Sequence, residues 1–596
     1  PSRQGSPVRR AAFLFGDAML AWPVSHSVLV NRPTPAIVTQ EAVRRLPRLA
    51  LLLFCAAYVL PGLIGREPWK SLDMASLGYM LSLARGEGTW NLPSLLGLPP
   101  ELDGLLPYWL GALFIRLSSD IVPAFLAVRI PFMGLVVLTM AATWNAVYNL
   151  ALSAKAQPVA FAFGGEASPK EYARAMADAG LLALIATLGL AQPSHEITPM
   201  VVQLALLSLA FYGVAALPHH RGRAYTALAL SVLGLTLSGA PSLALLLGGS
   251  LTLLCLWDSE LPHRLENALW LSGLCLLSAA ISLQADLWQW RIRPPHAAWN
   301  EWRTLLRLLL WFTWPAWPLA LWTLWRWRHQ WCNRVMHRHL LLPLWLVALT
   351  TTCALITASA ERTLLLALPP LAALAAFALP TLQRSVSAFI DWFTLLFFSG
   401  CALVIWVVWV AVQTGWPAQP AANVARLLPG FSPSWGPLAF GTALLATLTW
   451  LWLVKWRVGR HRAALWKSLV LPAGGAALCW LLLMTLWLPL LDFARSYGPL
   501  VRNVNALMGA PACVQVYGMN RAQMAAFQYH GNYPVHRLEG HACEWLVIDA
   551  DALPAFQRLL AANEWDLVKK VWRPSDNNEN VILFKRSSAA AEPRHE

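Results

Sequence analysis

Residues 122–152 read VPAFLAVRIPFMGLVVLTMAATWNAVYNLAL, an apolar run in which Arg129 is the one charged residue. A helix that crosses the hydrocarbon core of a bilayer needs about 20 predominantly apolar residues. Similar apolar runs recur along most of the chain. Because an α-helix satisfies its own backbone polar groups inside lipid, runs of this length predict transmembrane helices.

The composition leads to the same class of protein. Of the 596 residues, 57% are hydrophobic and 13% are charged, whereas an ordinary soluble domain has about 25% charged residues. The mean hydropathy is +0.50. These values exclude a soluble enzyme, a disordered chain and a coiled coil, and a transmembrane barrel would show short alternating segments instead. We therefore expect a polytopic α-helical membrane protein.

We expect about thirteen transmembrane helices of this kind. They cover residues 47–64, 122–152, 178–194, 198–217, 224–239, 242–257, 266–285, 304–325, 340–358, 363–382, 388–413, 437–455 and 466–490. Residues 105–118 are apolar but short, so we place them at the membrane interface rather than across the bilayer.

The positive charges predict the orientation. The net charge is +15 at pH 7, and basic residues gather near the N-terminus and in the segments 219–223, 326–339 and 455–462. About thirteen spans with a cytoplasmic N-terminus put all of these segments in the cytoplasm, in agreement with the positive-inside rule. The 33 Trp residues fit anchoring among membrane lipids better than base stacking, so no nucleic-acid partner is expected. We expect a multi-pass membrane protein with a cytoplasmic N-terminus; nothing in the sequence indicates its oligomeric state.

The composition divides the chain into three parts. Residues 1–45 are basic and contain Pro, so we expect a weakly ordered cytoplasmic segment. Residues 46–491 form the transmembrane module, with an outer-side loop at 65–121. From residue 492 the apolar runs give way to mixed sequence, which predicts a small extracytoplasmic (periplasmic) α/β domain over 492–596.

Within this last part we expect strands at 513–517, 544–548 and 580–585 and a helix at 551–561. Cys513 and Cys543 are its only cysteines. A disulfide between them fits an oxidising compartment, and two buried free thiols are the alternative.

The loop after the first span carries the strongest candidate for chemistry. Residues 66–103 read REPWKSLDMASLGYMLSLARGEGTWNLPSLLGLPPELD, with Asp73 in otherwise apolar, Trp-containing surroundings. A carboxylate at a membrane boundary is costly unless it is used or paired. Partial burial and access to a lipid-borne substrate would suit a general base. A helix-capping role for Asp73, ahead of a helix over 74–85, is the alternative.

The layout of these segments resembles the GT-C class of polyprenyl-phosphate-sugar-dependent glycosyltransferases. It looks most like the aminoarabinose transferase branch, which is similar to the protein O-mannosyltransferases. The matching residues are Asp73, Gly97-Leu98-Pro99, Tyr108-Trp109-Leu110, Arg129-Ile130-Pro131, and Glu361-Arg362-Thr363 followed by LLLALPPLAALAA. The resemblance covers residues 45–590. It implies an enzyme that moves a sugar from a polyprenyl-phosphate-linked donor to an extracytoplasmic acceptor, with lipid A as the first acceptor class and a protein or another glycan next.

The chain departs from the family pattern at several positions. Met74 follows Asp73 where the family has Glu, and Glu101 with Leu102-Asp103-Gly104-Leu105 stands where the family has Glu-Lys-Pro-Pro. The Lys that would hold a lipid phosphate is therefore missing. Where a second Asp is expected, the chain has His195-Glu196. We interpret Glu196 as a substitute assisted by His195. The departures imply a different sugar or acceptor, or a non-catalytic relative.

We chose the candidate site residues by the chemistry that the transfer reaction requires. The donor phosphate leaves as an anion, which cations must stabilise. The outer-side candidates are Arg129, Arg291, Arg293 and Arg362, although snorkelling or interfacial anchoring would also explain each of them. For the acceptor, Asp73 is the first choice of carboxylate, Glu196 the second, and Glu101 or Asp103 the third. The predicted substrate-binding set also contains Tyr108, Trp109, His195 and Glu361. We expect no metal and no cofactor besides the lipid-linked donor substrate.

A lipid or sugar-lipid transporter, or a non-catalytic partner in a glycosylation machinery, is the alternative function. The missing Lys and second Asp support it. Transporters often contain internal repeats and broken helices at the midplane. The sequence shows no repeat, and charged residues are nearly absent from the middle of the spans. These observations favour the transferase.

Overall fold

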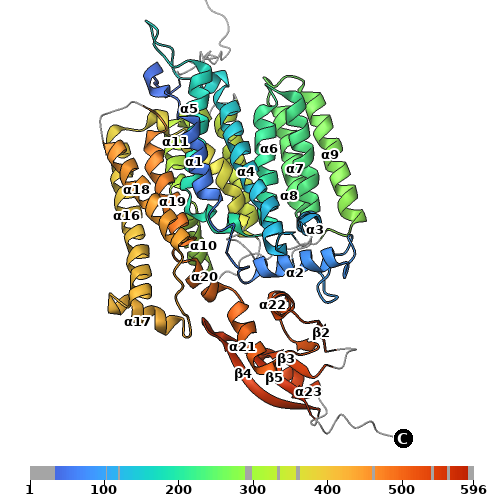
Figure 1. Ribbon diagram of the computed structural model, residues 1–596. Helices are drawn as coiled ribbons and strands as arrows, with labels where there is room; N and C mark the ends of the chain where they lie inside the picture. Colours follow the sequence, from blue (N-terminus) through green and yellow to red (C-terminus); the bar gives the residue numbers. More distant parts are fainter. Residues whose placement is uncertain are drawn as a thin grey trace, which may run out of the picture. The chain divides into compact units, whose positions relative to one another are not determined.

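The computed structural model of the chain describes residues 34–101, 104–118, 121–288, 299–331, 336–356, 363–458, 464–538, 543–559 and 564–587. Helices built from the apolar runs form its body (Figure 1). They are α1 (Arg48–Val59), α4 (Ala124–Ala151), α5 (Pro169–Ala186), α6 (Pro199–Ala216), α7 (Arg221–Leu237), α8 (Pro241–Trp257), α9 (Arg264–Gln284), α10 (Trp299–Phe312), α11 (Ala316–Arg326), α13 (Arg338–Leu355), α15 (Leu368–Ala376), α16 (Arg384–Thr414), α18 (Pro437–Val458) and α19 (Lys467–Leu483). The other helices before the C-terminal domain are α2 (Leu72–Arg85), α3 (Leu106–Ser118), α12 (Arg328–Trp331), α17 (Ala418–Leu427) and α20 (Leu488–Arg495).

The helix lengths bear on the number of spans. Among the described residues, six helices are long and apolar enough to cross a membrane: α4, α6, α9, α13, α16 and α18. The number is eight if each of two bent pairs is one span. These pairs are α5 with residues 188–195, bent by 65°, and α19 with α20, bent by 70°. The architecture is that of a polytopic α-helical membrane protein, and the full set of about thirteen spans stays a prediction.

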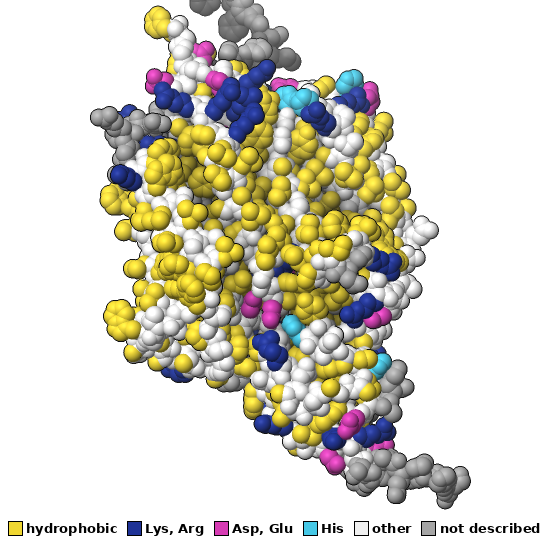
Figure 2. All heavy atoms as spheres, in the orientation of Figure 1, with side chains coloured by type: hydrophobic (Ala, Val, Ile, Leu, Met, Phe, Trp, Pro, Cys, Tyr) yellow, Lys and Arg dark blue, Asp and Glu magenta, His cyan; other side chains and the backbone are white. Residues whose placement is uncertain are grey.

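The outer surface of the helical body is apolar. Figure 2 shows hydrophobic side chains over most of this body, with Lys and Arg side chains gathered at its upper end. On α16 and α18, Leu396, Leu403, Leu445 and Trp452 point outward and are exposed. In water such a surface would aggregate, whereas in lipid it matches the solvent.

The expected span over 304–325 is broken, and the two bent pairs interrupt those expected over 178–194 and 466–490. Residues 304–325 form parts of two helices, α10 and α11, and not one continuous helix. Pro315 lacks a backbone N–H, and the residue before a proline is disfavoured in helical conformation, so α10 ends at Phe312. The continuous helix expected over 304–325 is therefore wrong.

Part of the expected N-terminal segment is packed. Of residues 1–45, the structure describes 34–45, in which Val38 and Val43 are buried. Ser168 N donates a hydrogen bond to Gln40 Oε1 at 2.9 Å. These residues therefore lie against the start of α5.

The C-terminal part forms a five-stranded sheet with the order β2-β1-β3-β5-β4. Its strands are β1 (Val514–Tyr517), β2 (Val535–Arg537), β3 (Trp545–Asp549), β4 (Trp565–Arg573) and β5 (Asp576–Arg586), and its helices are α21 (Gly498–Met508), α22 (Arg521–Gly531) and α23 (Leu553–Leu559). β1 pairs in parallel with β2 and β3, whereas β5 is antiparallel to β3 and β4. The expected strands correspond to β1, β3 and β5, and the expected helix to α23. The sequence analysis missed β2, β4, α21 and α22.

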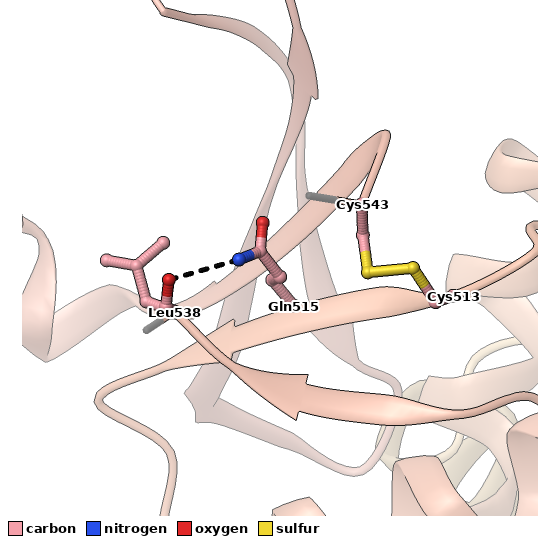
Figure 3. Close-up of a disulfide and its surroundings, with 4 residues drawn as sticks. All are labelled: Cys513, Gln515, Leu538 and Cys543. Carbon is pink, nitrogen blue, oxygen red and sulfur yellow. Dashed lines mark hydrogen bonds between the residues drawn. A yellow bond between two sulfur atoms is a disulfide. The ribbon is translucent and has the colours of Figure 1, made fainter. Parts of the chain in front are cut away.

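A disulfide joins the starts of two neighbouring strands. Cys513 lies before β1 and Cys543 lies before β3, with their Cα atoms 5.5 Å apart (Figure 3). Close by, Gln515 Nε2 donates a hydrogen bond to Leu538 O at 3.1 Å. In the oxidising compartment that we expect, this bond would restrain the unfolded chain and stabilise the sheet.

Close helix packing connects the sheet domain to α2. An added Cβ at Gly78 of α2 would lie 2.5 Å from Ala525 Cβ of α22, a distance that real Cβ atoms do not adopt. Gln528 Nε2 of α22 also donates to Glu87 Oε2, just after α2, at 3.2 Å. The absence of a side chain at Gly78 therefore lets the two helices approach.

We predict that Gly78→Ala destabilises this contact. Overpacking of a tight interface costs about 1–3 kcal/mol, so the melting temperature of the purified protein should fall. Gly273→Ala in α9 is the matched control, because nothing lies within 4 Å of its Cβ position. In an Ala525→Gly background, Gly78→Ala should lower the melting temperature less than in wild type, because the clashing Cβ is absent; an equal loss in both backgrounds would contradict the account.

Candidate active site

Asp73 lies in the first turn of α2 and is 1% exposed. Its Oδ2 accepts hydrogen bonds from Arg66 Nη2 at 2.9 Å and from the Trp69 backbone N–H at 3.1 Å. Its Oδ1 accepts a hydrogen bond from the Ile197 backbone N–H at 2.8 Å. Both carboxylate oxygens thus accept hydrogen bonds from donors in two separate segments, residues 66–69 and residue 197. The N-cap of α2 is Ser71, so Asp73 has a larger role than a helix cap.

Arg66 lies in the loop between α1 and α2, residues 60–71, which we call the α1–α2 loop. Its side chain is fully enclosed with that of Asp73. Arg66 Nη2 also donates to His195 O at 3.0 Å, and its guanidinium carbon lies 4.7 Å from the centre of the Trp69 ring. Removing one partner of a buried ion pair leaves an uncompensated charge and costs about 3–5 kcal/mol.

Arg129, near the start of α4, holds the same loop. It is 3% exposed. Its Nη1 donates to Gly62 O at 3.0 Å and Leu63 O at 3.1 Å, and its Nη2 donates to Glu67 O at 3.4 Å. The guanidinium also stacks on the ring of Phe125, 3.6 Å from its centre. Because carbonyl oxygens at the end of a helix attract cations, Arg129 stabilises the chain where α1 ends.

The two arginines retain hydrogen-bonding capacity. Within the described part of the chain, Nε and Nη1 of Arg66 and Nε of Arg129 are buried and have no hydrogen-bond partner. Buried donors are normally paired, and unpaired ones often indicate an ion or a water molecule. Guanidinium groups bind phosphate oxygens with particular strength. The arrangement is chemically suited to a small anion.

His195 and Glu196 lie beside this ion pair, in and just after the short helix η5 (Pro193–His195). The His195 ring lies within hydrogen-bond distance of Ala191 O and Tyr58 O, at 2.6 and 3.1 Å. Glu196 Oε1 accepts a hydrogen bond from Gln192 Nε2 at 3.2 Å.

Glu196 lines a cleft of about 320 Å³ that α10 also lines through Leu308, Trp311 and Phe312. Among the described residues, Glu196 (4% exposed) lines this cleft, and Asp73 (1% exposed) is not in its lining.

The predicted residues on α3 contact the far part of α2. The Tyr108 ring lies 5.4 Å from the ring of Tyr79, two turns along α2 from Asp73. Trp109 Nε1 donates to Trp90 O at 2.7 Å. Glu101 is exposed in the segment before α3. Asp103, Arg291, Arg293, Glu361 and Arg362, also predicted, lie outside the described residues.

The sequence analysis missed several residues that organise the site. Lys70 Nζ pairs with Asp576 at 3.1 Å and Glu579 at 3.2 Å, across the turn between β4 and β5. Trp69 Nε1 donates to Asp492 Oδ1 of α20 at 2.8 Å. The charged sequence REPWK at 66–70 could have indicated that Arg66 and Lys70 belong to the site. Their partners are up to several hundred residues away, where no local pattern reveals them.

Comparisons with known proteins identify the fold. No family model matches the sequence, and a search of curated proteins gives no similar sequence. Among solved structures, the chain is similar to ArnT from Cupriavidus metallidurans bound to undecaprenyl phosphate, with a TM-score of 0.56 and 13% identity over 92% of this chain and 98% of that one. The same protein in the apo state gives a TM-score of 0.55 with the same identity and coverage. The chain has the fold of this GT-C glycosyltransferase, as the resemblance of its motifs predicts.

We predict that Asp73→Asn lowers the free energy of unfolding by about 3 kcal/mol, because the charge of Arg66 is left buried and unpaired. Thermal unfolding of the purified protein measures the loss. The control is Glu544→Gln, since Glu544 pairs with Lys585 on the surface with both side chains at least half exposed; that change should cost under about 1 kcal/mol.

A double variant, Arg66→Met with Asp73→Leu, should recover part of the stability lost in Asp73→Asn. It removes both charges together, but it also leaves the Trp69 and Ile197 backbone N–H groups without their acceptor. Equal melting temperatures for wild type and Asp73→Asn would show that this pair does not stabilise the fold.

Proposed function

We propose that the protein is a membrane glycosyltransferase that moves a sugar from a polyprenyl-phosphate-linked donor to an extracytoplasmic acceptor. The observation that carries this proposal is the buried Arg66–Asp73 pair at the first turn of α2, within a chain that has the ArnT fold over 92% of its length. We place the protein in the bacterial inner membrane as a multi-pass protein, with its C-terminal domain in the periplasm.

The arginines suit the donor. In the reaction, the bond between the anomeric carbon of the sugar and a phosphate oxygen breaks, and the polyprenyl phosphate leaves with the electron pair. The unpartnered donors of Arg66 and Arg129 are as enclosed as Asp73, so the α1–α2 loop would have to open before they could stabilise the negative charge on the leaving oxygen. The structure of ArnT with undecaprenyl phosphate supports an isoprenoid lipid as the carrier. Leaving as a phosphate needs no metal in this scheme.

We assign different roles to the carboxylates of Asp73 and Glu196. The oxygens of Asp73 are already held by three donors, so we assign Asp73 the role of positioning Arg66 and the α1–α2 loop. Glu196 borders the cleft beside α10 and is our candidate for the base that accepts the proton of the acceptor group. This reverses the order of preference that the sequence suggests, because a base needs access to the acceptor.

A non-catalytic relative or a sugar-lipid transporter is the competing function. The specific observation in its favour is the enclosure of Asp73, together with the missing family Lys. If the ion pair only stabilises the fold, its replacement by apolar residues will leave function intact. The two proposed functions therefore predict different activities for a variant in which apolar residues replace the ion pair.

We predict that the Arg66→Met, Asp73→Leu double variant folds but loses transfer by about a hundredfold or more. Mass spectrometry of the host's lipid A, envelope glycans and exported proteins is the measurement. It compares the intact gene, its deletion, and the deletion complemented by wild type, by the double variant or by Glu196→Gln. A sugar-sized mass that disappears on deletion and returns only with wild type supports the proposal and identifies the acceptor.

The double variant controls for folding in this experiment, because its stability can be measured independently. Complete restoration of the modification by the double variant would assign the pair to stability alone. No difference in any glycoconjugate between the intact gene and its deletion, with the protein present, would favour the transporter or non-catalytic reading.

A further inference from the structure

A second cleft, of about 580 Å³, lies outside the site described above. Segments distant in the sequence line it: the α1–α2 loop, the loop between α17 and α18, the helices α20 and α21, and the turn between β4 and β5. Its volume is within the range of small-molecule sites, on the order of 300–1,000 Å³. In Figure 2 acidic, basic and His side chains gather between the apolar body and the lower domain.

The cleft adjoins the candidate active site. Glu67, which lines it, is the neighbour of Arg66 in the chain, and its carbonyl oxygen accepts the hydrogen bond from Arg129. Trp69 connects the two sites directly: its backbone N–H donates to Asp73, and its indole Nε1 donates to Asp492, which lines the cleft. A molecule bound in the cleft would thus lie against the loop that carries Arg66.

The charges of the lining are unfavourable for an anion. Glu67 and Asp492 provide two carboxylates, and Arg502 is the basic residue of the lining. Arg502 Nη1 lies 3.8 Å from Glu67 Oε1, so Glu67 offsets part of its charge within the cleft. A phosphorylated group would therefore meet two carboxylates and one guanidinium, an unfavourable balance for an anion.

The remaining lining suits a sugar. Phe431 and Phe493 pack edge to face with ring centres 5.4 Å apart, and both line the cleft, where they offer an apolar surface to C–H groups. Asn503 and Ser432 add uncharged donors and acceptors beside the carboxylates.

The walls are also rigid. Pro429, Pro489, Pro499 and Pro574 line the cleft, and Gly430 turns there with a φ of 84°. Because prolines fix the backbone, the cleft is largely formed before anything binds, and little conformational entropy is lost on binding.

From these observations we propose that this cleft binds an uncharged, hydroxyl-rich sugar of the acceptor, and not a phosphorylated one. The assignment to the acceptor rests on the proposed function, while the binding of a neutral sugar does not. It deepens that function, because it favours a neutral glycan over a phosphate-bearing headgroup as the acceptor class.

The test is saturation-transfer difference NMR with the full chain in nanodiscs, free of sugar-based detergent. The probes are lactose and N,N′-diacetylchitobiose as neutral disaccharides, glucose 1-phosphate as an anion, and trilysine as a cation. We expect saturation transfer from the protein to a neutral disaccharide and no transfer to glucose 1-phosphate. Asn503→Leu should weaken the binding of the neutral disaccharide about fivefold, as expected for the loss of hydrogen bonds to an amide.

Gln557→Leu is the matched control, since Gln557 is an exposed amide residue of α23 that does not line the cleft. It should leave binding unchanged. Four results would each overturn the proposal. The first two are no saturation transfer to either neutral disaccharide and equal transfer to glucose 1-phosphate. The others are stronger transfer to trilysine and equal effects of the two Leu variants on binding. Because the assay measures binding and not transfer, its result is independent of whether the chain is a transferase.

Discussion

A guanidinium group buried in an apolar environment must be paired, and this constraint organises the outer side of the helical body. Arg66 meets it through the carboxylate of Asp73 and the carbonyl oxygen of His195. Asp73 in turn binds the Ile197 backbone. One ion pair therefore fixes the α1–α2 loop, the first turn of α2 and the segment after η5 relative to one another. The low dielectric that makes these groups costly when unpaired also makes the pairing strong.

The same loop joins the C-terminal domain to the helices. The backbone N–H of Lys70 donates to Arg495 O at 2.9 Å, and its side chain pairs with Asp576 and Glu579. Ser575 Oγ donates to Ala494 O at 2.7 Å, which ties the turn between β4 and β5 to α20. The loop that carries Arg66 is thus held from one side by α4 and from the other by the sheet domain. A displacement of that domain would be transmitted directly to the candidate site.

The sequence predicts what depends on local patterns. Apolar runs such as 388–413 become helices because hydropathy and backbone satisfaction are local properties, and α16 follows that run closely. The span expected over 304–325 is wrong because hydropathy takes no account of Pro315. β2 has only three residues and β4 has many exposed side chains, so neither shows a clear alternation of apolar and polar residues. Asp73 could be singled out as a carboxylate at a membrane boundary. Arg66 was not, although its partner Asp73 is seven residues away, because no local pattern shows that both side chains are buried together.

The structure also bears on the lysine that the family pattern leads one to expect. If the donor is a polyprenyl phosphate, the cation that the missing lysine would supply must come from elsewhere in the chain. Arg66 and Arg129 are anchored through their Nη atoms, and their remaining buried donors have no partner among the described residues. Donors that are unsatisfied before the reaction and satisfied by the leaving phosphate stabilise the transition state more than the ground state. In that case the free-energy cost of the unpaired donors is offset when negative charge develops on the leaving oxygen. Buried arginines held by a carboxylate and by carbonyl oxygens could then take over the task of the missing lysine without a change of fold.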